Sequence, residues 1–232
     1  MVRAITPLPR RSTRATLYTP LQAAKLIKEL DTAKFDETVE AHFRLGIDTR
    51  KADQNIRGSI SLPHGTGKTV RVAVSPEGEK AREAEAARRR HHRFRRARRP
   101  DQKGEINFDA AIATPNMMAK VGRIGKILGP RGLMPNPKLG TVTMDVAKMV
   151  SELKAGRVEY RADRYGICHV PLGKKSFSEQ QLVENYAALY TEILRVKPSS
   201  AKGKYVKSIS VSSTMGPGVK VDPAVQRDFL AE

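Results

Sequence analysis

The segment SSTMGPG, residues 212–218, has a composition that suits contact with a nucleic acid. Hydroxyl groups such as that of Thr214, together with exposed backbone amides, can bond a phosphate or a ribose 2′-hydroxyl. Gly216 permits a close approach of the backbone, and Met215 can pack on a base or a sugar. A plain surface turn would have the same composition, so both interpretations stay open from these residues alone.

Two further stretches offer contacts of the same kind. In TAKFDETVE, residues 32–40, Phe35 follows Lys34, and an aromatic side chain there either stacks on an unpaired base or packs into the core. The glycine- and proline-rich stretch LGPRGLMPNPKLGT, residues 128–141, offers Arg131 and Lys138 to phosphates, although a solvated connection also explains it. These stretches indicate a binding surface only if other features point to a nucleic acid.

The motif HGTGKT, residues 64–69, resembles the end of a nucleotide-binding phosphate loop, but its register is wrong. The first glycine of that loop would fall at Leu62, and the following TVRVAV alternates as a strand, whereas the loop must open a helix. The five histidines show no metal-ligand spacing with carboxylates, and Cys168 stands alone. The sequence therefore predicts no catalytic residue, no metal ion and no cofactor.

The charge balance points to a polyanionic partner. The chain of 232 residues has 43 lysines and arginines against 24 acidic residues, a net charge of +19. Eight arginines lie in RRRHHRFRRARRP, residues 88–100, yet removing them leaves a net charge of +11, so a second basic surface must exist. RNA, DNA and an acidic membrane surface all fit. The absence of a long apolar run predicts a soluble intracellular protein without a membrane partner.

Elements from both ends of the chain must position the candidate contacts. Residues 19–22 form a helix N-terminus with a capping box, and apolar residues then recur at helical spacing. From Thr38, polar and apolar residues alternate, which predicts a strand with one buried face. The other predicted elements are a short strand over 59–62, a hairpin turning at 163–166, a long helix capped by Ser178 and a closing strand over 204–213.

The middle of the chain has a different pattern, in which strands alternate with helices. TVRVAVS and FDAAIAT predict strands, whereas EGEKAREAEAA and the residues after Pro115 and Met144 predict helices. Such alternation is typical of βαβ units on a parallel sheet. Because the flanks can then complete a single core, we predict two domains of α/β and α+β class, with the α/β domain inserted into a discontinuous α+β domain.

The predicted boundaries are a flexible basic arm over 1–18, domain I over 19–65 and 157–232, and domain II over 66–156. The chain crosses between the domains near Gly65 and Gly156. Glycines at these crossings serve either as hinges or as ordinary turns.

Five stretches, in order, resemble the bacterial-type ribosomal protein L-one family of the mobile stalk on the large subunit. They are KFDETVE, DQNIRGSISLPHGTGK, GKILGPRGLMPNPKLGTVT, FSEQQLVENY and STMGPGVKVDP. The match extends from about Leu17 to Pro223 and is broken only near Arg88 to Pro100. The resemblance implies a discontinuous α+β RNA-binding domain with an inserted Rossmann-like α/β domain, no enzymatic activity, and a place on the cytoplasmic ribosome.

The resemblance also implies partners and contacts. Members bind a helical junction of large-subunit ribosomal RNA as a monomer within the ribosome, assist the exit of deacylated tRNA from the exit site, and repress translation of their own messenger RNA. The RNA contacts that it carries over are Lys34, Phe35, Thr38, Asp163, Arg164, Ser208, Thr214, Met215 and Gly216. Basic side chains would neutralise phosphates, and the Thr-Met-Gly turn would recognise RNA shape.

Two other functional classes remain as alternatives. A nucleotide-dependent enzyme that uses HGTGKT predicts nucleotide binding that is lost on changing Lys68. A general nucleic-acid-coating protein predicts affinity carried by the arginine run and the basic arm, with little preference among RNAs.

The arginine run conflicts with the resemblance, since the family has an apolar strand and an acidic helix start there. Eight arginines cannot be buried in a sheet without a large desolvation cost. Suitable codons for Arg88 to Arg99, shifted by one nucleotide, encode the family-like Gly-Ala-Asp-Ile-Ile-Gly-Ser-Asp-Glu-Leu-Val-Asp. We hypothesise a compensated frameshift, in the gene or in its recorded sequence; a genuine basic insertion that touches RNA and a disordered loop are the competing interpretations. An intact mass, or sequencing of the peptide from Ala86 to Lys103, tests the recording error, which unaltered arginines would exclude.

Overall fold

The computed structural model describes residues 16–30, 33–75, 108–123, 125–137, 140–225 and 228–230. The helix predicted from EGEKAREAEAA, the arginine run, Lys138 and the first fifteen residues of the basic arm lie outside these ranges. Tyr18, which the sequence assigned to the flexible arm, is instead bonded into the fold. Its N–H donates to the carbonyl oxygen of Lys220 at 3.1 Å, and its carbonyl oxygen accepts from the N–H of Asp222 at 3.0 Å. The chain divides into two compact units, Met1–Lys68 with Gly156–Glu232, and Thr69–Ala155.

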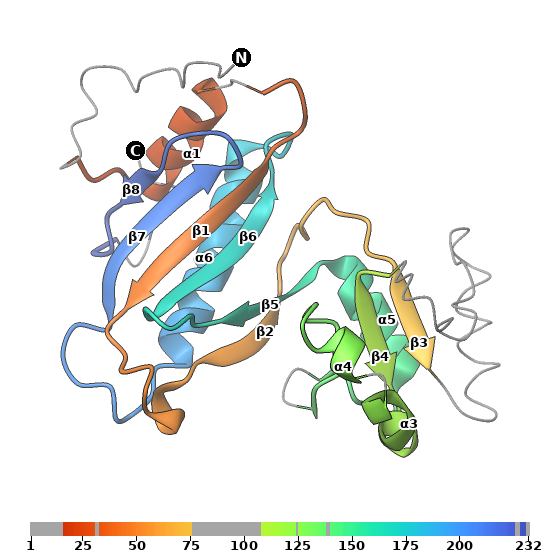
Figure 1. The fold of residues 1–232 in the computed structure, drawn as a ribbon. Coiled ribbons are helices and arrows are strands. Elements are labelled where there is room, and N and C mark those ends of the chain that lie inside the picture. Colours follow the sequence, from red (N-terminus) through yellow and green to blue (C-terminus); the bar gives the residue numbers. More distant parts are fainter. Residues whose placement is uncertain are drawn as a thin grey trace, which may run out of the picture. The chain divides into compact units, whose positions relative to one another are not determined.

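The first unit contains helices and antiparallel strands from both ends of the chain (Figure 1). Its elements are α1 (Pro20–Glu29), β1 (Thr38–Leu45), η1 (Ala52–Gln54), β2 (Arg57–Ser61), β5 (Arg157–Arg161), β6 (Ile167–Lys174), α6 (Glu179–Arg195), β7 (Val206–Ser213) and β8 (Val219–Val221). Both predicted helix starts are confirmed. The side chain of Thr19 caps α1, the side chain of Ser178 caps α6, and each forms a complete capping box with the glutamine three residues later.

A four-stranded sheet of order β6-β1-β7-β8 organises this unit, and every pair in it is antiparallel. The predicted strand from Thr38 is a central strand. It pairs with a late strand on each side, with Ala41 opposite Val170 on β6 and Val211 on β7. The early and late parts of the chain therefore share one sheet.

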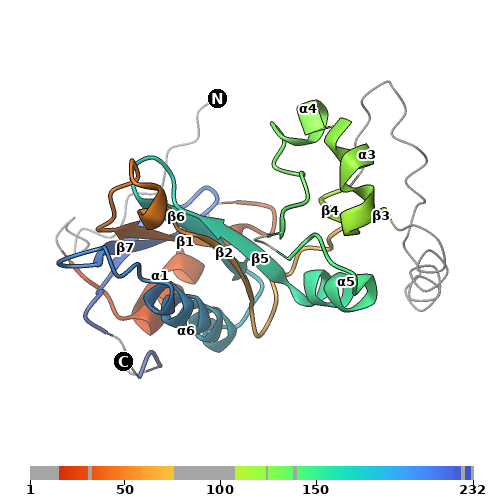
Figure 2. The ribbon, with the colours of Figure 1, turned by 90° about the horizontal axis from the view of Figure 1, so that it is seen from below.

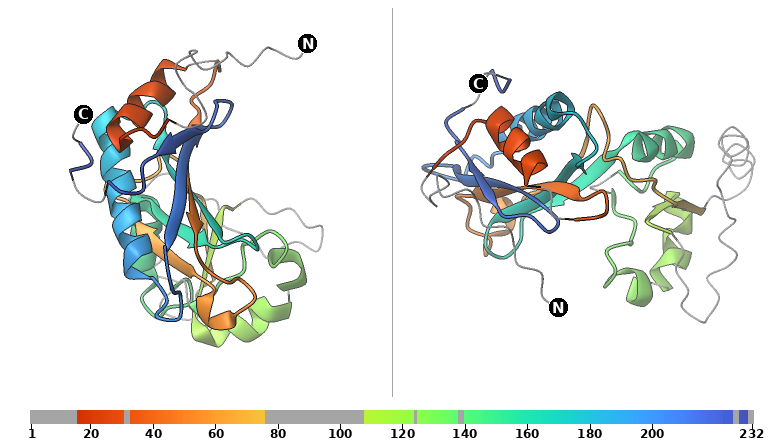
Figure 3. Two further views of the ribbon diagram at one scale, coloured as in Figure 1. Left: turned by 90° about the vertical axis from the view of Figure 1, so that its left-hand side faces the viewer. Right: turned by 90° about the horizontal axis from the view of Figure 1, so that it is seen from above.

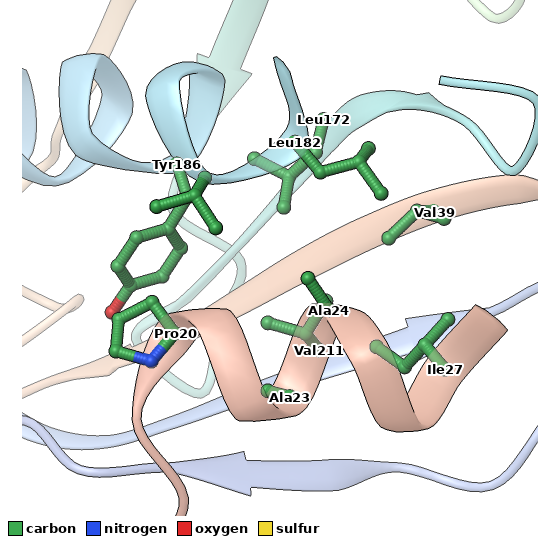
Figure 4. A pocket seen from close by; sticks show the side chains of 10 residues that line it. Pro20, Ala23, Ala24, Ile27, Val39, Leu172, Leu182, Tyr186 and Val211 are labelled. Carbon is green, nitrogen blue, oxygen red and sulfur yellow. The ribbon is translucent and has the colours of Figure 1, made fainter. Parts of the chain in front are cut away.

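The hydrophobic core of the first unit lies on one face of this sheet. Val39, Ala41, Phe43 and Leu45 of β1 are buried, as the alternating sequence predicted. Helices α1 and α6 lie together over that face (Figures 2 and 3). A small apolar pocket between these helices and the sheet, lined by residues such as Tyr186, belongs to the same core (Figure 4). Within the described residues of the unit, no α-helix covers the opposite face, which we call the helix-free face.

Strands β5 and β6 follow one another, but they do not form the regular hairpin that the sequence predicted. β5 pairs with β2 in a separate antiparallel sheet, and one isolated bridge, Ala162 to Cys168, links it to the residues of β6. The turn itself is present, since the N–H of Gly166 donates to the carbonyl oxygen of Asp163 at 3.1 Å. β5 instead forms five residue pairs with β2.

The second unit has parallel strand pairing, as the alternation of strands and helices predicted. β3 (Val72–Ser75) pairs in parallel with β4 (Ala110–Ala113), and Ala113 forms a parallel bridge to Val142. The helical elements described here are η2 (Pro115–Met117), α3 (Met118–Arg123), α4 (Gly125–Leu128) and α5 (Val146–Ala155). The helix predicted near Met144 begins at Val146, because Asp145 Oδ1 accepts from the N–H of Lys148 at 3.3 Å as an N-cap does. Apolar residues of α5 pack on the β3–β4 pair.

Gly65 and Gly156 approach each other inside the first unit. Both have a positive φ, 66° and 101°, and a Cβ on Gly156 would lie 2.2 Å from the Cα of Gly65. The fully buried Asn185 of α6 donates to the carbonyl oxygens of Gly65 at 3.0 Å and Leu172 at 2.7 Å, and it accepts from the N–H of His64 at 3.1 Å. These bonds hold Gly65 in a fixed turn. Among the described helices, none is long and apolar enough to cross a membrane.

Candidate nucleic-acid interface

The start of β1 and the turn after β7 are joined residue by residue. The N–H of Thr38 donates to Thr214 Oγ1 at 3.1 Å, and that hydroxyl donates to the carbonyl oxygen of Thr38 at 3.3 Å. The N–H of Met215 donates to Glu37 Oε1 at 3.2 Å. Two distant segments therefore form one local structure. We give the name Met215 cluster to Thr38, Thr214 and Met215, together with Lys34, Phe35 and Gly216, which lie near them along the two chain segments.

Gly216 completes the turn of the Met215 cluster. Its N–H donates to the carbonyl oxygen of Ser213 at 3.3 Å. An ideal Cβ at this position would lie 2.3 Å from Ser213 Oγ, which is closer than two such atoms can come. Because Ser213 is itself buried, a larger residue at 216 requires the turn to shift.

The Met215 cluster exposes large apolar side chains. Phe35 is 56% exposed and Met215 is 60% exposed, and the charged side chain of Lys34 is exposed as well. The alternative that Phe35 packs into the core is therefore wrong. Exposed apolar patches beside polar groups mark interaction sites, and these two side chains lie on segments that the hydrogen bonds above join.

A third segment, at the end of β6 and in the turn after it, forms hydrogen bonds with the residues that lead into β1. Asp36 accepts from the N–H of Ser176 at 3.0 Å with Oδ1 and from its hydroxyl at 2.9 Å with Oδ2. Lys174 Nζ donates to Thr38 Oγ1 at 2.9 Å and to the carbonyl oxygen of Asp36 at 3.3 Å. The backbone around Phe35 is thus ordered before any partner binds, which lowers the entropy cost of binding.

The helix-free face of the four-stranded sheet continues from the Met215 cluster. Its outward-facing side chains include Thr38, Glu40, His42 and Arg44 on β1, His169 on β6, and Ser208, Ser210 and Ser212 on β7. Ser208 lies opposite Arg44. Ser208 is five residues from Ser213, the last residue of β7, which corresponds to roughly 17 Å at the usual rise of a strand. The structure therefore places Ser208 on the same sheet but away from the Met215 cluster.

Two histidines meet at the centre of this face. His42 Nδ1 lies 2.9 Å from His169 Nδ1, and His42 Nε2 lies 3.1 Å from Ser212 Oγ. One of the two facing nitrogens must donate and the other accept, so this bond needs a neutral ring. Burial lowers the pKa of His42, and the charge of His169 lowers it further, while Glu40 opposes both effects.

The remaining predicted contacts form a second group, the Asp163 turn, which comprises Asp163, Arg164 and Tyr165. Asp163 Oδ1 accepts from the N–H of Tyr165 at 2.9 Å and from that of Ile167 at 2.8 Å. Burial raises the pKa of Asp163, but the hydrogen bonds from Ile167 and Tyr165 and the nearby His169 outweigh it, so the pKa is lowered. The guanidinium of Arg164 lies 4.9 Å from the centre of the Tyr165 ring, which is 67% exposed.

The structure does not support a phosphate loop at HGTGKT. Residues 64–69 are followed by β3, which begins at Val72, and no helix opens between them. Among the residues described, no group of three or more histidine, cysteine or acidic side chains could hold a metal ion.

Sequence reasoning missed three residues of this surface, His42, Tyr165 and His169, and the buried Glu37 beneath it. Glu37 reads as an exposed acid, and the pairing of His42 with His169 depends on strand register across 127 residues. Of these residues, only Tyr165 could have been found from the sequence, because it is an aromatic residue between Arg164 and the glycine of a predicted turn.

Comparison with known proteins shows the family of the chain. A family model described as "Ribosomal protein L1p/L10e family" matches residues 26–217. The chain belongs to this family. Members of the ribosomal protein L1p/L10e family are structural ribosomal proteins, so the chain is not an enzyme and works on the cytoplasmic ribosome.

Individual relatives match over almost the whole chain. "Large ribosomal subunit protein uL1" of Rubrobacter xylanophilus is 58% identical over 219 residues, 94% of this chain and 95% of that protein. The protein of the same name from Thermobifida fusca is 56% identical over 215 residues, 93% of this chain and 92% of that protein. That from Mycobacterium tuberculosis is 57% identical over 219 residues, 94% of this chain and 93% of that protein.

Proposed function

We propose that this chain is a structural component of the large ribosomal subunit that binds ribosomal RNA through the Met215 cluster. One observation carries the proposal. The turn at 214–216 and the segment before β1 are locked together by hydrogen bonds, yet Phe35 and Met215 remain exposed. A preordered surface with exposed apolar groups, in a chain of net charge +19, suits a folded RNA.

Each group in the Met215 cluster has a distinct role in this proposal. Lys34 neutralises phosphate charge, and Thr38 and Thr214 offer hydroxyls to phosphates or to ribose 2′-hydroxyls. Phe35 and Met215 pack on unpaired bases or sugars, and Gly216 lets the backbone approach. Such a surface recognises the shape of a helical junction and does not read a base sequence.

Ser208 and the Asp163 turn extend the contact along the sheet. Arg164 carries a positive charge, and Asp163 fixes the backbone that presents it. Because Ser208 lies at the far end of β7 from the Met215 cluster, one RNA that touches both must cross the helix-free face. The outward-facing Arg44 and His42 would then meet the same RNA.

The names of the relatives refer only to the large ribosomal subunit. The proposals about the stalk, tRNA and messenger RNA come from the family resemblance. We include in the proposal that the chain acts as a monomer in the mobile stalk and assists the exit of tRNA. A leader of its own messenger RNA that imitates the ribosomal junction would bind the same Met215 cluster, since shape recognition does not distinguish the two RNAs.

A competition binding assay tests this function. Labelled large-subunit RNA that contains the junction competes with unstructured RNA of equal length for wild type, Met215→Asp, Gly216→Val and a deletion of residues 88–99. Met215→Asp places a carboxylate against RNA, and Gly216→Val forces the turn to shift, so both should weaken junction binding at least tenfold, about 1.4 kcal/mol. The deletion should keep the preference for the junction.

The same assay, together with nucleotide binding measured on wild type and Lys68→Ala, separates the alternative classes. A coating protein would lose affinity with the deletion and would not prefer the junction. A nucleotide-dependent protein would bind a nucleotide in a manner that Lys68→Ala abolishes. Either result, with junction binding unaffected by Met215→Asp, would refute the proposed function.

A further inference from the structure

Glu37 is an acidic side chain that the fold buries completely. It lies between the exposed Asp36 and the partly buried Thr38, and its own exposed fraction is 0%. Its backbone carbonyl accepts from the N–H of Lys175 at 2.8 Å, which holds the chain at the edge of the sheet. Its side chain extends to the turn after β7, where Oε1 accepts from the N–H of Met215 at 3.2 Å.

Stability does not explain a glutamate at this position. Glu37 Oε2 is buried and makes no hydrogen bond within the described part of the chain. A buried polar atom without a hydrogen-bond partner destabilises the folded state. An apolar side chain of similar size in place of a buried charged group is often neutral or stabilising.

Within the described part of the chain, the one side-chain hydrogen bond of Glu37 goes to the turn that carries Met215. Thr38 holds Thr214 through two hydrogen bonds from the exposed side, and Glu37 holds Met215 from the buried side. Consecutive residues before and at the start of β1 therefore clamp consecutive residues of the turn. A clamp on both sides fixes the backbone of Met215 while its side chain stays 60% exposed.

We propose that Glu37 is a positioning residue for RNA binding, whose buried carboxyl oxygen fixes the Met215 backbone in the RNA-binding conformation. The inference rests on the proposed function of the Met215 cluster. Glu37 need not touch RNA, because it acts by removing alternative conformations of the turn before binding. The role requires an acceptor oxygen at this position, but it does not require a negative charge.

Two substitutions of similar size separate the acceptor from mere bulk. Glu37→Gln keeps an oxygen that can accept from Met215, whereas Glu37→Met has none. In the full chain, Glu37→Met should keep or raise the melting temperature and weaken junction RNA binding about fivefold, the typical effect of one lost hydrogen bond. Glu37→Gln should bind RNA within about threefold of wild type.

Gln54→Met is the matched control. Gln54 is also buried, and it bonds the N–H of Asp48 at 2.7 Å and the carbonyl oxygen of Ser200 at 3.3 Å, away from the Met215 cluster. Its loss should lower the melting temperature and leave RNA affinity unchanged. The control and Glu37→Met are thus expected to show opposite effects on stability and affinity.

The outcomes distinguish this inference from the function on which it rests. If Met215→Asp weakens junction binding but Glu37→Met binds as wild type, the inference fails and the proposed function stands. If Glu37→Gln is as weak as Glu37→Met, an acceptor oxygen is not what matters and the inference also fails. If Met215→Asp binds as wild type, the proposed function itself fails.

Hydrogen exchange supplies a readout on wild type that does not depend on the variants folding. The Met215 amide should exchange more slowly than that of its exposed neighbour Thr214, because a buried oxygen accepts from it. Exchange at the rate of an unprotected amide would overturn the clamp, whatever the variants show.

Discussion

The hydroxyl of Thr214 lies between the two backbone polar groups of Thr38. It accepts from the Thr38 N–H at 3.1 Å and donates to the Thr38 carbonyl oxygen at 3.3 Å. One side chain thus replaces the ladder bonds that β1 and β7 would otherwise continue past Ser213. The turn that we propose to bind RNA begins where side-chain hydrogen bonds replace strand pairing.

Thr214→Val removes this hydroxyl and keeps the shape of the side chain. Two hydrogen bonds are lost, and we expect the affinity for junction RNA to fall about five- to tenfold, or roughly 1–1.4 kcal/mol. Filter binding or calorimetry measures the change. Thr191→Val is the control, since Thr191 Oγ1 bonds the carbonyl oxygen of Ala187 on the exposed side of α6. Equal affinity in the Thr214 variant would show that the turn keeps its conformation without this hydroxyl.

Gly216→Ala tests whether the turn is limited by space. The new Cβ would meet Ser213 Oγ at 2.3 Å, so the single variant should weaken RNA binding several-fold, about 1 kcal/mol. Ser213→Ala removes that oxygen, and the double variant should recover much of the lost affinity. The recovery appears as a coupling energy in a double-mutant cycle. Additive losses would mean instead that a side chain at 216 obstructs the RNA directly.

The sequence predicts the local elements of the first unit because their signals are local. Thr19 with Gln22 and Ser178 with Gln181 form their capping boxes within one helical turn, so both helix starts are readable. The alternation from Thr38 likewise predicts which face of β1 is buried. The pairing partner of β5 is not local. No pattern in residues 157–174 indicates that β5 pairs with β2 and diverges from β6.

The candidate site is less readable from residues alone. Composition allowed two interpretations of Phe35, stacking on an unpaired base or packing into the core. The predicted contact residues came from the family resemblance. Glu37 and Met215 are 178 residues apart, and a buried acid is rare enough that sequence reasoning assigns it to the surface. Such residues become visible only when the sheet register brings both chain ends together.

The histidine pair predicts a pH dependence of stability. Burial and the charge of His169 lower the pKa of His42, so the folded state prefers the neutral ring more than the unfolded state does. The stabilising contribution is present above the ordinary pKa of about 6.5 and is lost as the pH falls through the lowered value. Urea unfolding at pH 7.5 and pH 5 should therefore show a smaller loss of stability on acidification in His42→Gln than in wild type. Equal losses in the two proteins would contradict the assigned shift.

Asn185 predicts a large structural effect without an effect on RNA. Replacing it with leucine leaves the carbonyl oxygens of Gly65 and Leu172 and the N–H of His64 without their buried partner. The cost should be about 3 kcal/mol of unfolding free energy, because unsatisfied buried groups each cost on the order of 1 kcal/mol or more. Calorimetry should show a clear fall in melting temperature, while Asn55→Leu at an exposed position should change it little.

Since Asn185 lies on α6, on the opposite face of the sheet from the proposed RNA surface, junction RNA binding measured well below the new melting temperature should match wild type. A selective loss of RNA affinity in Asn185→Leu would show that the turn at Gly65 is linked to the Met215 cluster.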